Sequence, residues 1–172
     1  GYYPGAVVLV GHNGKTIYKG VFGNRSILPD VQPMRFDTIF DMASLTKVMA
    51  TTPAIMQLIE RGKLALDGRV ATYWPAFANN GKGDITIRQL LTHTSGLEAG
   101  IPAAENIPQT ANPRYPWQGT STALRAIETR KTIATPGSKF LYSDVNFIVL
   151  AHLVELVSKQ PFDVYVKRHV FK

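Results

Sequence analysis

The sequence FDMASLTK, at residues 40–47, places Ser44 three positions before Lys47. The residues that follow carry apolar side chains at three-to-four-residue spacing as far as Arg61, a pattern typical of one helix face. Residues three apart on a helix lie on the same side of it, about one turn from each other. The sequence therefore predicts that Ser44 and Lys47 share one surface at the start of a helix.

This pair of side chains can carry nucleophilic chemistry. A lysine that is kept neutral by burial, or that hydrogen-bonds to the serine oxygen, can accept the hydroxyl proton. The positive end of the helix would also stabilise an oxyanion. A serine that caps a helix, followed by an exposed lysine, gives the same spacing without any chemistry. Taken by itself, the spacing favours this structural interpretation.

The helix expected over residues 44–61 contains Pro53. Because proline removes a helical hydrogen bond and clashes with the preceding turn, we expect a kink or a break there. In that case Thr52 would cap the second segment. Gly62 follows the last periodic residue and is expected to end the helix.

Two β-rich runs stand at the N-terminal end, at residues 6–10 and 16–22, on either side of Asn13-Gly14. An Asn-Gly pair between such runs is a strong hairpin signal, because both turn positions need positive φ. Residues 38–40 are expected to be strand-like after a loop. A hairpin by itself is marginally stable in water, and its sheet partners are not evident in the sequence.

Tyr142, Ser143 and Asp144 precede an apolar run at residues 145–158, which predicts a helix buried on most sides with Asp144 as its N-cap. A tyrosine at such an entry can face a cleft and carry protons if a lysine lowers its pKa. The alternative is a packed aromatic residue followed by a capping aspartate. For this segment by itself, the alternative is favoured.

Prolines and glycines crowd residues 96–120, and we expect a long, lid-like loop there. The four histidines are far apart and have no zinc-site spacing, so no metal site is predicted. They are His12, His93, His152 and His169. His93, in LLTHTSGL, resembles a structural, hydrogen-bonding histidine.

The composition is that of a globular domain, with 45% hydrophobic and 18% charged residues among 172. The formal charge is +7, but no basic run is interleaved with aromatic residues, so nucleic-acid binding is not expected. The absence of cysteine excludes disulfides and thiol catalysis. No apolar stretch is long enough to predict a transmembrane segment.

Several segments occur in a distinctive order along the chain. They are PGAVV (4–8), FDMASLTK (40–47), ERGKLALD (60–67), IRQLLTHTSGL (87–97), PG (136–137) and FLYSDVNF (140–147). Over essentially the whole chain, this series closely resembles the serine β-lactamase and penicillin-binding-protein superfamily. The match is to its class C-like branch, which includes family VIII esterases and D-Ala-D-Ala carboxypeptidase-like hydrolases. The resemblance implies an α+β, β-lactamase/transpeptidase-like fold.

The resemblance also implies roles for individual residues. Ser44 would be the acylated nucleophile, Lys47 its activating partner, and Tyr142 the proton shuttle of the family's Tyr-x-Asn element. Asp144 stands where that element has an asparagine that anchors a substrate amide, and a carboxylate lacks the asparagine's donors. Trp117, in Trp-Gln-Gly at residues 117–119, precedes Tyr142, so we assign it to the lid-like loop as a substrate-binding candidate.

The family's third motif is Lys-Thr-Gly, His-x-Gly or Trp-x-Gly on a strand after the tyrosine, and none of these follows Tyr142. We therefore expect the chain to be the N-terminal part of a single catalytic domain, an incomplete fold without the C-terminal sheet strands. Residues 1–40 would hold the hairpin and residues 41–160 a mainly helical region. A complementing C-terminal segment or a second chain would supply the rest.

The expected function is a serine hydrolase that forms an acyl-enzyme with a small ester, amide or β-lactam carbonyl, without metal or organic cofactor. Asp144 favours ester or peptide substrates over β-lactams. The alternative is a non-catalytic module that binds acyl or peptidoglycan-like ligands. Members of the family that the chain resembles are often exported to the bacterial envelope, which favours a periplasmic or secreted location, but some esterase members are intracellular, so the location stays open.

Overall fold

The computed structural model describes residues 3–101 and 119–171. The chain divides into two compact units, Gly1–Ala43 and Ser44–Lys172. The first unit contains the strands and the second contains the helices. This division lies three residues from the boundary at residues 40 and 41 that the sequence suggested.

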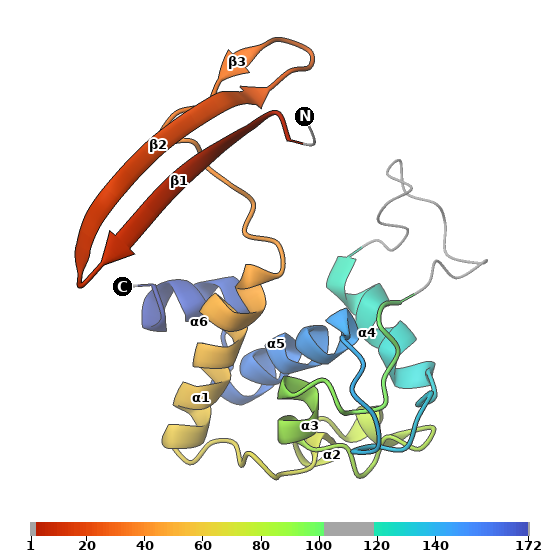
Figure 1. Cartoon of the computed structure of the whole chain (residues 1–172). Coiled ribbons are helices and arrows are strands. Elements are labelled where there is room, and N and C mark those ends of the chain that lie inside the picture. The colour runs from red at the N-terminus through yellow and green to blue at the C-terminus, as the bar shows by residue number, and fades with distance from the viewer. Residues whose placement is uncertain (1–2, 102–118, 172) are drawn as a thin grey trace. The chain divides into compact units, whose positions relative to one another are not determined.

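The strand unit is built on an antiparallel hairpin of β1 (Gly5–His12) and β2 (Lys15–Ser26) (Figure 1). Asn13 has a φ of 48° and Gly14 a φ of 73°, so both turn residues adopt the left-handed conformation that such a turn requires. The predicted hairpin is confirmed. The sequence placed its strands within these bounds, and β2 extends four residues further.

A third strand, β3 (Gln32–Pro33), pairs with the far end of β2. The prediction of a strand at residues 38–40 is wrong. The Thr38 hydroxyl accepts the Arg35 backbone N–H at 3.0 Å, and the Thr38 N–H bonds back to the Arg35 carbonyl. These bonds close a turn, so the local hydrogen bonding of Thr38 outweighs the strand preference of its apolar neighbours.

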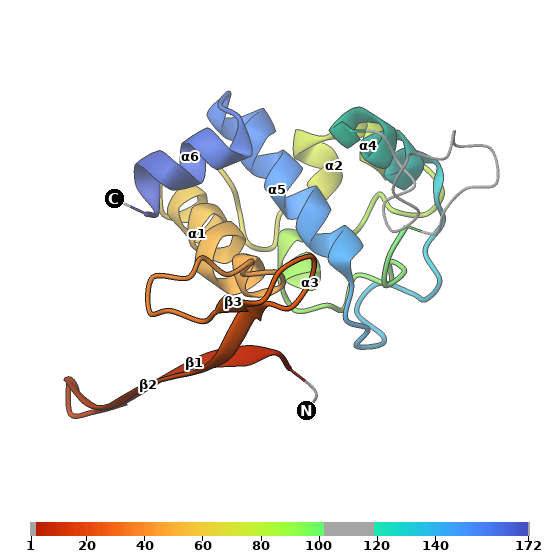
Figure 2. The ribbon, with the colours of Figure 1, turned by 90° about the horizontal axis from the view of Figure 1, so that it is seen from above.

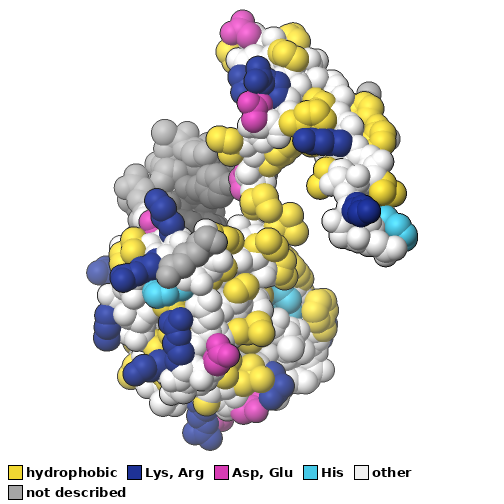
Figure 3. All heavy atoms as spheres, turned by 90° about the vertical axis from the view of Figure 1, so that its left-hand side faces the viewer, with side chains coloured by type: hydrophobic (Ala, Val, Ile, Leu, Met, Phe, Trp, Pro, Cys, Tyr) yellow, Lys and Arg dark blue, Asp and Glu magenta, His cyan; other side chains and the backbone are white. Residues whose placement is uncertain are grey.

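The strand unit leaves much apolar surface in contact with solvent, as Figure 3 shows. Along β1 and β2 both faces are exposed, since consecutive residues with side chains on opposite faces are open. The exposed apolar side chains of the two strands are Val8, Leu9, Val10, Ile17, Tyr18 and Phe22. Apolar side chains are therefore exposed on both faces of the hairpin.

The first helical segment of the second unit is continuous through Pro53. It begins with a π-helical turn, η1 (Lys47–Thr51), and passes directly into α1 (Thr52–Glu60). The expected break, with Thr52 as a cap, is therefore wrong, and the alternative of a kink at Pro53 stays a prediction. Proline is tolerated in the first turn of α1, and the wider π turn bonds the Thr52 N–H to the Lys47 carbonyl. Gly62, with a φ of 66°, follows the end of the helix as predicted.

Six more helical elements follow in the described part of the second unit. They are α2 (Val70–Tyr73), η2 (Pro75–Ala78), α3 (Ile87–Leu91), α4 (Gly119–Thr129), α5 (Asp144–Ser158) and α6 (Phe162–His169). In Figures 1 and 2, α5 runs through the middle of the unit, and it contacts α1, α2, α3 and α6. The expected burial of α5 on most sides is confirmed, because Val149, Leu150 and Leu153 are fully buried in one continuous apolar core.

The N-terminus of α5 differs from the prediction in one residue. Ser143, not Asp144, is the N-cap: its hydroxyl accepts the Asn146 N–H at 3.2 Å. Asp144 is the first helical residue, and its N–H donates to the Ala99 carbonyl at 2.8 Å. Because Ser143 does the capping, the carboxylate of Asp144 is available for another partner.

Candidate active site

Ser44 lies at the entrance to the first helical segment, where the backbone is constrained. Ala43, directly before it, has a φ of 42°, which is uncommon for a residue with a side chain. The Asp41 carboxylate accepts the Ala43 N–H at 2.8 Å and so holds this turn. Strained backbone of this kind is found at functional sites.

The predicted pairing of Ser44 with Lys47 is present. The Lys47 ammonium donates to the Ser44 hydroxyl over 3.2 Å. The Lys47 side chain is largely buried, with 14% of its surface exposed. Lys47 is therefore mostly shielded from solvent, and it contacts Ser44 directly.

The strongest contact of Lys47 is with α5. Its ammonium donates a hydrogen bond of 2.6 Å to Oδ1 of the Asp144 carboxylate. The Asp144 side chain is 61% exposed, so the pair sits at the edge of solvent. Asp144 therefore acts as the counterion of Lys47.

These contacts set the charge of Lys47. Burial is the largest single influence and lowers the pKa of the lysine, but hydrogen bonds to Asp144 and Tyr142, together with their charges, outweigh it. The pKa of Lys47 is raised above its ordinary value as a result. The sequence suggested a lysine that is kept neutral by burial or that hydrogen-bonds to the serine oxygen; the hydrogen bond is present, and the raised pKa of Lys47 disfavours the neutral form.

Tyr142 completes the cluster from the segment before α5. The Lys47 nitrogen lies 5.0 Å from the centre of its ring. Hydrogen bonding from Lys47 and from Ser44, with the lysine's positive charge, lowers the pKa of Tyr142 against the opposing effects of burial and of Asp144. A nearby positive charge favours the deprotonated form of a tyrosine, so the lysine and the tyrosine are electrostatically linked.

His93 contacts this cluster, which the sequence did not reveal. Its ring packs against Tyr142 with the centres 4.6 Å apart, and Phe147 of α5 packs against the same imidazole at 5.2 Å. The sequence indicated a structural, hydrogen-bonding histidine, and His93 does bond to the segment around Tyr142. Fifty positions separate His93 from its partner Ser143, so no local signal connects the two.

Two sequence predictions concern the loop at residues 96–120. Trp117, the candidate substrate-binding residue, lies outside the described residues, as does most of that loop. The described part includes Glu98, which forms an ion pair with Arg130 at 2.9 Å. The described chain resumes with the helix α4, which begins at Gly119, inside the range expected to be loop.

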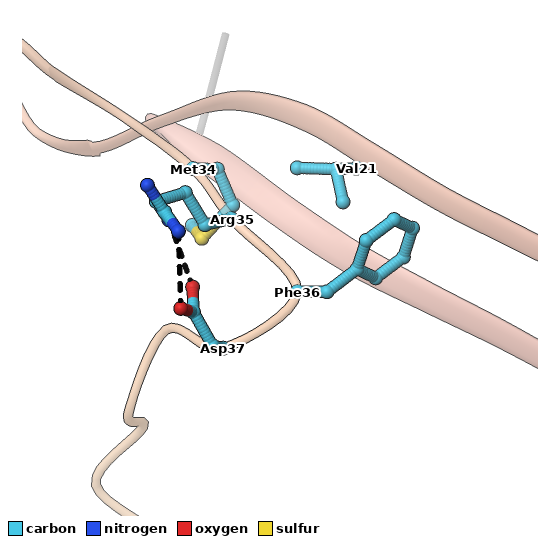
Figure 4. A pocket seen from close by; sticks show the side chains of 5 residues that line it. All are labelled: Val21, Met34, Arg35, Phe36 and Asp37. Atoms are coloured by element: carbon cyan, nitrogen blue, oxygen red, sulfur yellow. Dashed lines mark hydrogen bonds and ion pairs between the residues drawn. The ribbon is translucent and has the colours of Figure 1, made fainter.

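The strand unit has an open hollow of its own, shown in Figure 4. It is lined by Val21, Met34, Arg35, Phe36 and Asp37. The Arg35 guanidinium donates two hydrogen bonds, of 2.9 and 3.2 Å, to the Asp37 carboxylate. Because its charged groups are paired and it holds no nucleophile with a base beside it, the hollow is not the candidate active site.

Two further features concern the described residues as a set. Within residues 3–101 and 119–171, no three His, Asp or Glu side chains gather closely enough to hold a metal ion. Across the same ranges, no helix combines the length and apolar character needed to cross a membrane.

Comparison with known proteins gives matches over the full chain. The family model described as Beta-lactamase matches residues 1–172. An Escherichia coli K12 protein named "Putative D-alanyl-D-alanine carboxypeptidase" is 31% identical over 99% of this chain. A Bacillus subtilis protein named N-acetylmuramyl-L-alanine amidase is 30% identical, also over 99% of this chain. The chain spans 41% of the length of each of these two relatives.

Solved structures also match nearly the whole chain. EstCE1, a hydrolase with promiscuous acyltransferase activity, superimposes with a TM-score of 0.81 and 30% identity, over 99% of this chain and 46% of that one. The octameric penicillin-binding protein homologue from Pyrococcus abyssi superimposes with a TM-score of 0.79 and 28% identity, over 99% and 39% of the two chains.

Proposed function

Because the chain belongs to the beta-lactamase family and has part of its β-lactamase/transpeptidase-like fold, we propose that it is a serine hydrolase that forms an acyl-enzyme at Ser44. The observation that carries the proposal is the cluster in which charged Lys47 contacts both Ser44 and Asp144, beside a tyrosine of lowered pKa. A nucleophile next to a base that a third group orients is the arrangement that covalent catalysis needs.

In the acylation step, the Tyr142 oxygen takes the proton from the Ser44 hydroxyl as the serine oxygen attacks the substrate carbonyl carbon. Charged Lys47 favours the tyrosinate before this transfer and remains protonated through it. The tetrahedral intermediate collapses when its bond to the leaving group breaks. Tyr142 then gives the proton to the leaving oxygen or nitrogen, and an ester of Ser44 remains.

Deacylation repeats the same steps with water. Tyr142 takes a proton from the water as its oxygen attacks the acyl carbon, and it returns that proton to the Ser44 oxygen as the acid departs. The backbone N–H of Ser44 would supply one oxyanion donor. The other belongs, in this proposal, to the strand of the third motif, outside the 172 residues.

The substrate proposed is a small ester or peptide, ahead of a β-lactam. Asp144 occupies the position that the family gives to a donor-bearing asparagine, and its carboxylate already accepts from Lys47. It therefore offers a substrate amide oxygen no hydrogen bond. The relatives' names cover a carboxypeptidase, an amidase and a hydrolase with acyltransferase activity, which fits acyl transfer from carboxyl derivatives.

We further propose that the chain is the N-terminal part of one catalytic domain, with a lid-like loop at residues 96–120. A C-terminal segment or a second chain would cover the exposed faces of β1 and β2 and supply the third motif. The apolar surface of these strands supports this proposal. A monodisperse, cooperatively melting monomer of the 172 residues that binds no hydrophobic dye would contradict it.

The catalytic proposal is tested by hydrolysis of a p-nitrophenyl ester. We expect release of p-nitrophenol by the chain when the proposed C-terminal segment or second chain completes it, and none above background by Ser44→Ala completed in the same way. Equal rates for the two proteins would contradict the mechanism.

The exposed strand faces favour one other function, a binding module that keeps the fold without turnover. Such a module would hold an acyl ligand reversibly. If the chain binds an ester and its mass is still unchanged after long exposure to that ester, the result would favour this alternative.

A further inference from the structure

His93 is bonded to the chain on both sides of Tyr142. Its backbone carbonyl accepts the Leu141 N–H at 2.8 Å, and its ring Nδ1 accepts the Ser143 N–H at 3.0 Å. The imidazole also packs against the Tyr142 ring at a tilt of 30°. One residue therefore fixes the position of the tyrosine's backbone and of its ring.

The imidazole is itself held firmly in place. Phe147 packs against it at 5.2 Å, and the edge of Phe140 lies at 5.9 Å. The Asn146 amide nitrogen is 3.4 Å from Nδ1, and the buried Asn146 accepts from Ser95 at 2.6 Å. The histidine thus links the core of the helical unit to Tyr142, which is 45% exposed.

These bonds require one protonation state of His93. Nδ1 can accept the Ser143 N–H while it carries no proton, so the proton of the neutral ring resides on Nε2. A second proton would go to Nδ1 and would face the Ser143 donor, so that hydrogen bond would be lost. Protonation of His93 is therefore incompatible with the observed position of the segment.

The charged and titratable groups that face His93 are Lys47, Asp144 and Tyr142. Burial and the positive charge of Lys47 lower the pKa of His93, while Asp144 opposes them. The surroundings thus favour the neutral ring near neutral pH.

We propose that neutral His93 is the positioning residue that holds Tyr142 beside Lys47 and Ser44, and that protonation of His93 releases the tyrosine and switches the site off in acid. This inference rests on the proposed function for its effect on turnover. The positioning itself concerns the Tyr142 phenol and is measurable without turnover.

The test variant is His93→Asn. Asparagine tolerates the φ of 58° at this position, and its oxygen can accept the Ser143 N–H, but it has no ring and does not titrate. The matched control is His152→Asn, since His152 also packs against an aromatic ring, Trp74, at 4.7 Å but contacts no residue of the candidate site that the structure describes.

The first readout is the absorbance of tyrosinate as pH rises. The signal of Tyr142 is the difference between each protein and its Tyr142→Phe derivative. We expect a titration below the ordinary tyrosine range in the unaltered chain and in His152→Asn, and a return toward that range in His93→Asn. An unchanged Tyr142 titration in folded His93→Asn would overturn the inference, whether or not Ser44 is the nucleophile.

The second readout needs no variant. In NMR titration of the unaltered chain, the Ser143 amide and the Tyr142 ring should shift together with the His93 imidazole as the pH falls. Titration of His93 without any change at Tyr142 would overturn the inference.

The third readout is the pH profile of ester hydrolysis. We expect the logarithm of kcat to fall with a slope approaching two in acid for the unaltered chain, since both His93 and Tyr142 take up protons. His93→Asn should show a slope of one and a kcat about 10- to 100-fold lower, with KM little changed. A slope of two in His93→Asn would contradict the proposed switch, whereas inactivity of all the proteins would count against the proposed function and leave the absorbance result standing.

Discussion

The Lys47 ammonium and the Asp144 carboxylate meet at 2.6 Å although 97 positions separate them in the chain. This ion pair joins the first helical segment to the N-terminus of α5. It helps to keep Lys47 charged, and a charged Lys47 lowers the pKa of Tyr142. The pair thus assigns the proton-accepting role in the proposed mechanism to the tyrosine.

Asp144→Asn tests this assignment. The change removes the counterion, so we expect the pKa of Lys47 to fall, as seen in the NMR titration of its side-chain methylene. An asparagine also regains the amide donors that the family's element supplies, so acylation by a penicillin should become faster relative to ester hydrolysis. The comparison is the ratio of the two rates in each protein.

Asp163→Asn is the control for charge removal, because Asp163 lies in the first turn of a different helix, α6. It should leave that ratio unchanged. A ratio that stays constant in Asp144→Asn as well would contradict the role of Asp144 in setting substrate preference.

Tyr142→Phe removes the hydroxyl and keeps the ring. We expect kcat to fall about 10²- to 10⁴-fold, the usual contribution of a general acid–base group. Stability should change little, because the side chain is 45% exposed and its ring contact with His93 remains available. Steady-state ester hydrolysis and thermal unfolding measure the two effects, and a kcat within twofold of the unaltered protein would exclude Tyr142 as the base.

The shifted pKa values of Tyr142 and Lys47 determine how kcat/KM should change at alkaline pH. The pKa of Tyr142 is lowered from the ordinary tyrosine value by Lys47 and Ser44, and the pKa of Lys47 is raised from the ordinary lysine value by Asp144 and Tyr142. The reactive tyrosinate accumulates as the pH rises through the pKa of Tyr142, so activity should increase and then level off. It should decline when Lys47 loses its proton at higher pH. A fall in activity between pH 8 and 9, with the fold intact by circular dichroism, would contradict these assignments.

Lys82 lies outside the candidate site, and its role in the structure can be tested by its effect on stability. Its side chain is fully buried, and its ammonium donates to the carbonyls of Asn79, Glu128 and Arg130. Lys82→Met should lower the free energy of unfolding by about 3 kcal/mol, because each buried carbonyl left without a donor costs about 1–3 kcal/mol. Denaturant unfolding measures the loss. Lys139→Met, at an exposed lysine, should change stability by less than about 0.5 kcal/mol, and equal effects of the two changes would disprove the role of Lys82.

The parts of the fold that the sequence predicted are those with a local cause. Asn13 and Gly14 specify the hairpin because their own backbone preferences make the turn. The burial of α5 was predictable because the apolar side chains of the helix itself disfavour contact with water. The Ser44–Lys47 contact also follows from helical spacing.

What the sequence did not predict depends on tertiary contacts. Ser143 and Asp144 are equally good caps by residue type, and the burial of Ser143 decides between them. A lysine is normally exposed, so the interior position of Lys82 has no signal in the sequence. The charge of Lys47 and the support of Tyr142 by His93 likewise depend on segments brought together by folding.

The most direct test of the account is intact-mass spectrometry after exposure to a fluorophosphonate probe, carried out on the chain together with the segment proposed to complete its domain, with Ser44→Ala treated in parallel. The account predicts one probe adduct on each unaltered chain, located at Ser44 by peptide mapping, and no adduct on Ser44→Ala. A chain that stays unmodified, or an adduct that persists in Ser44→Ala, would contradict the assignment of Ser44 as the nucleophile.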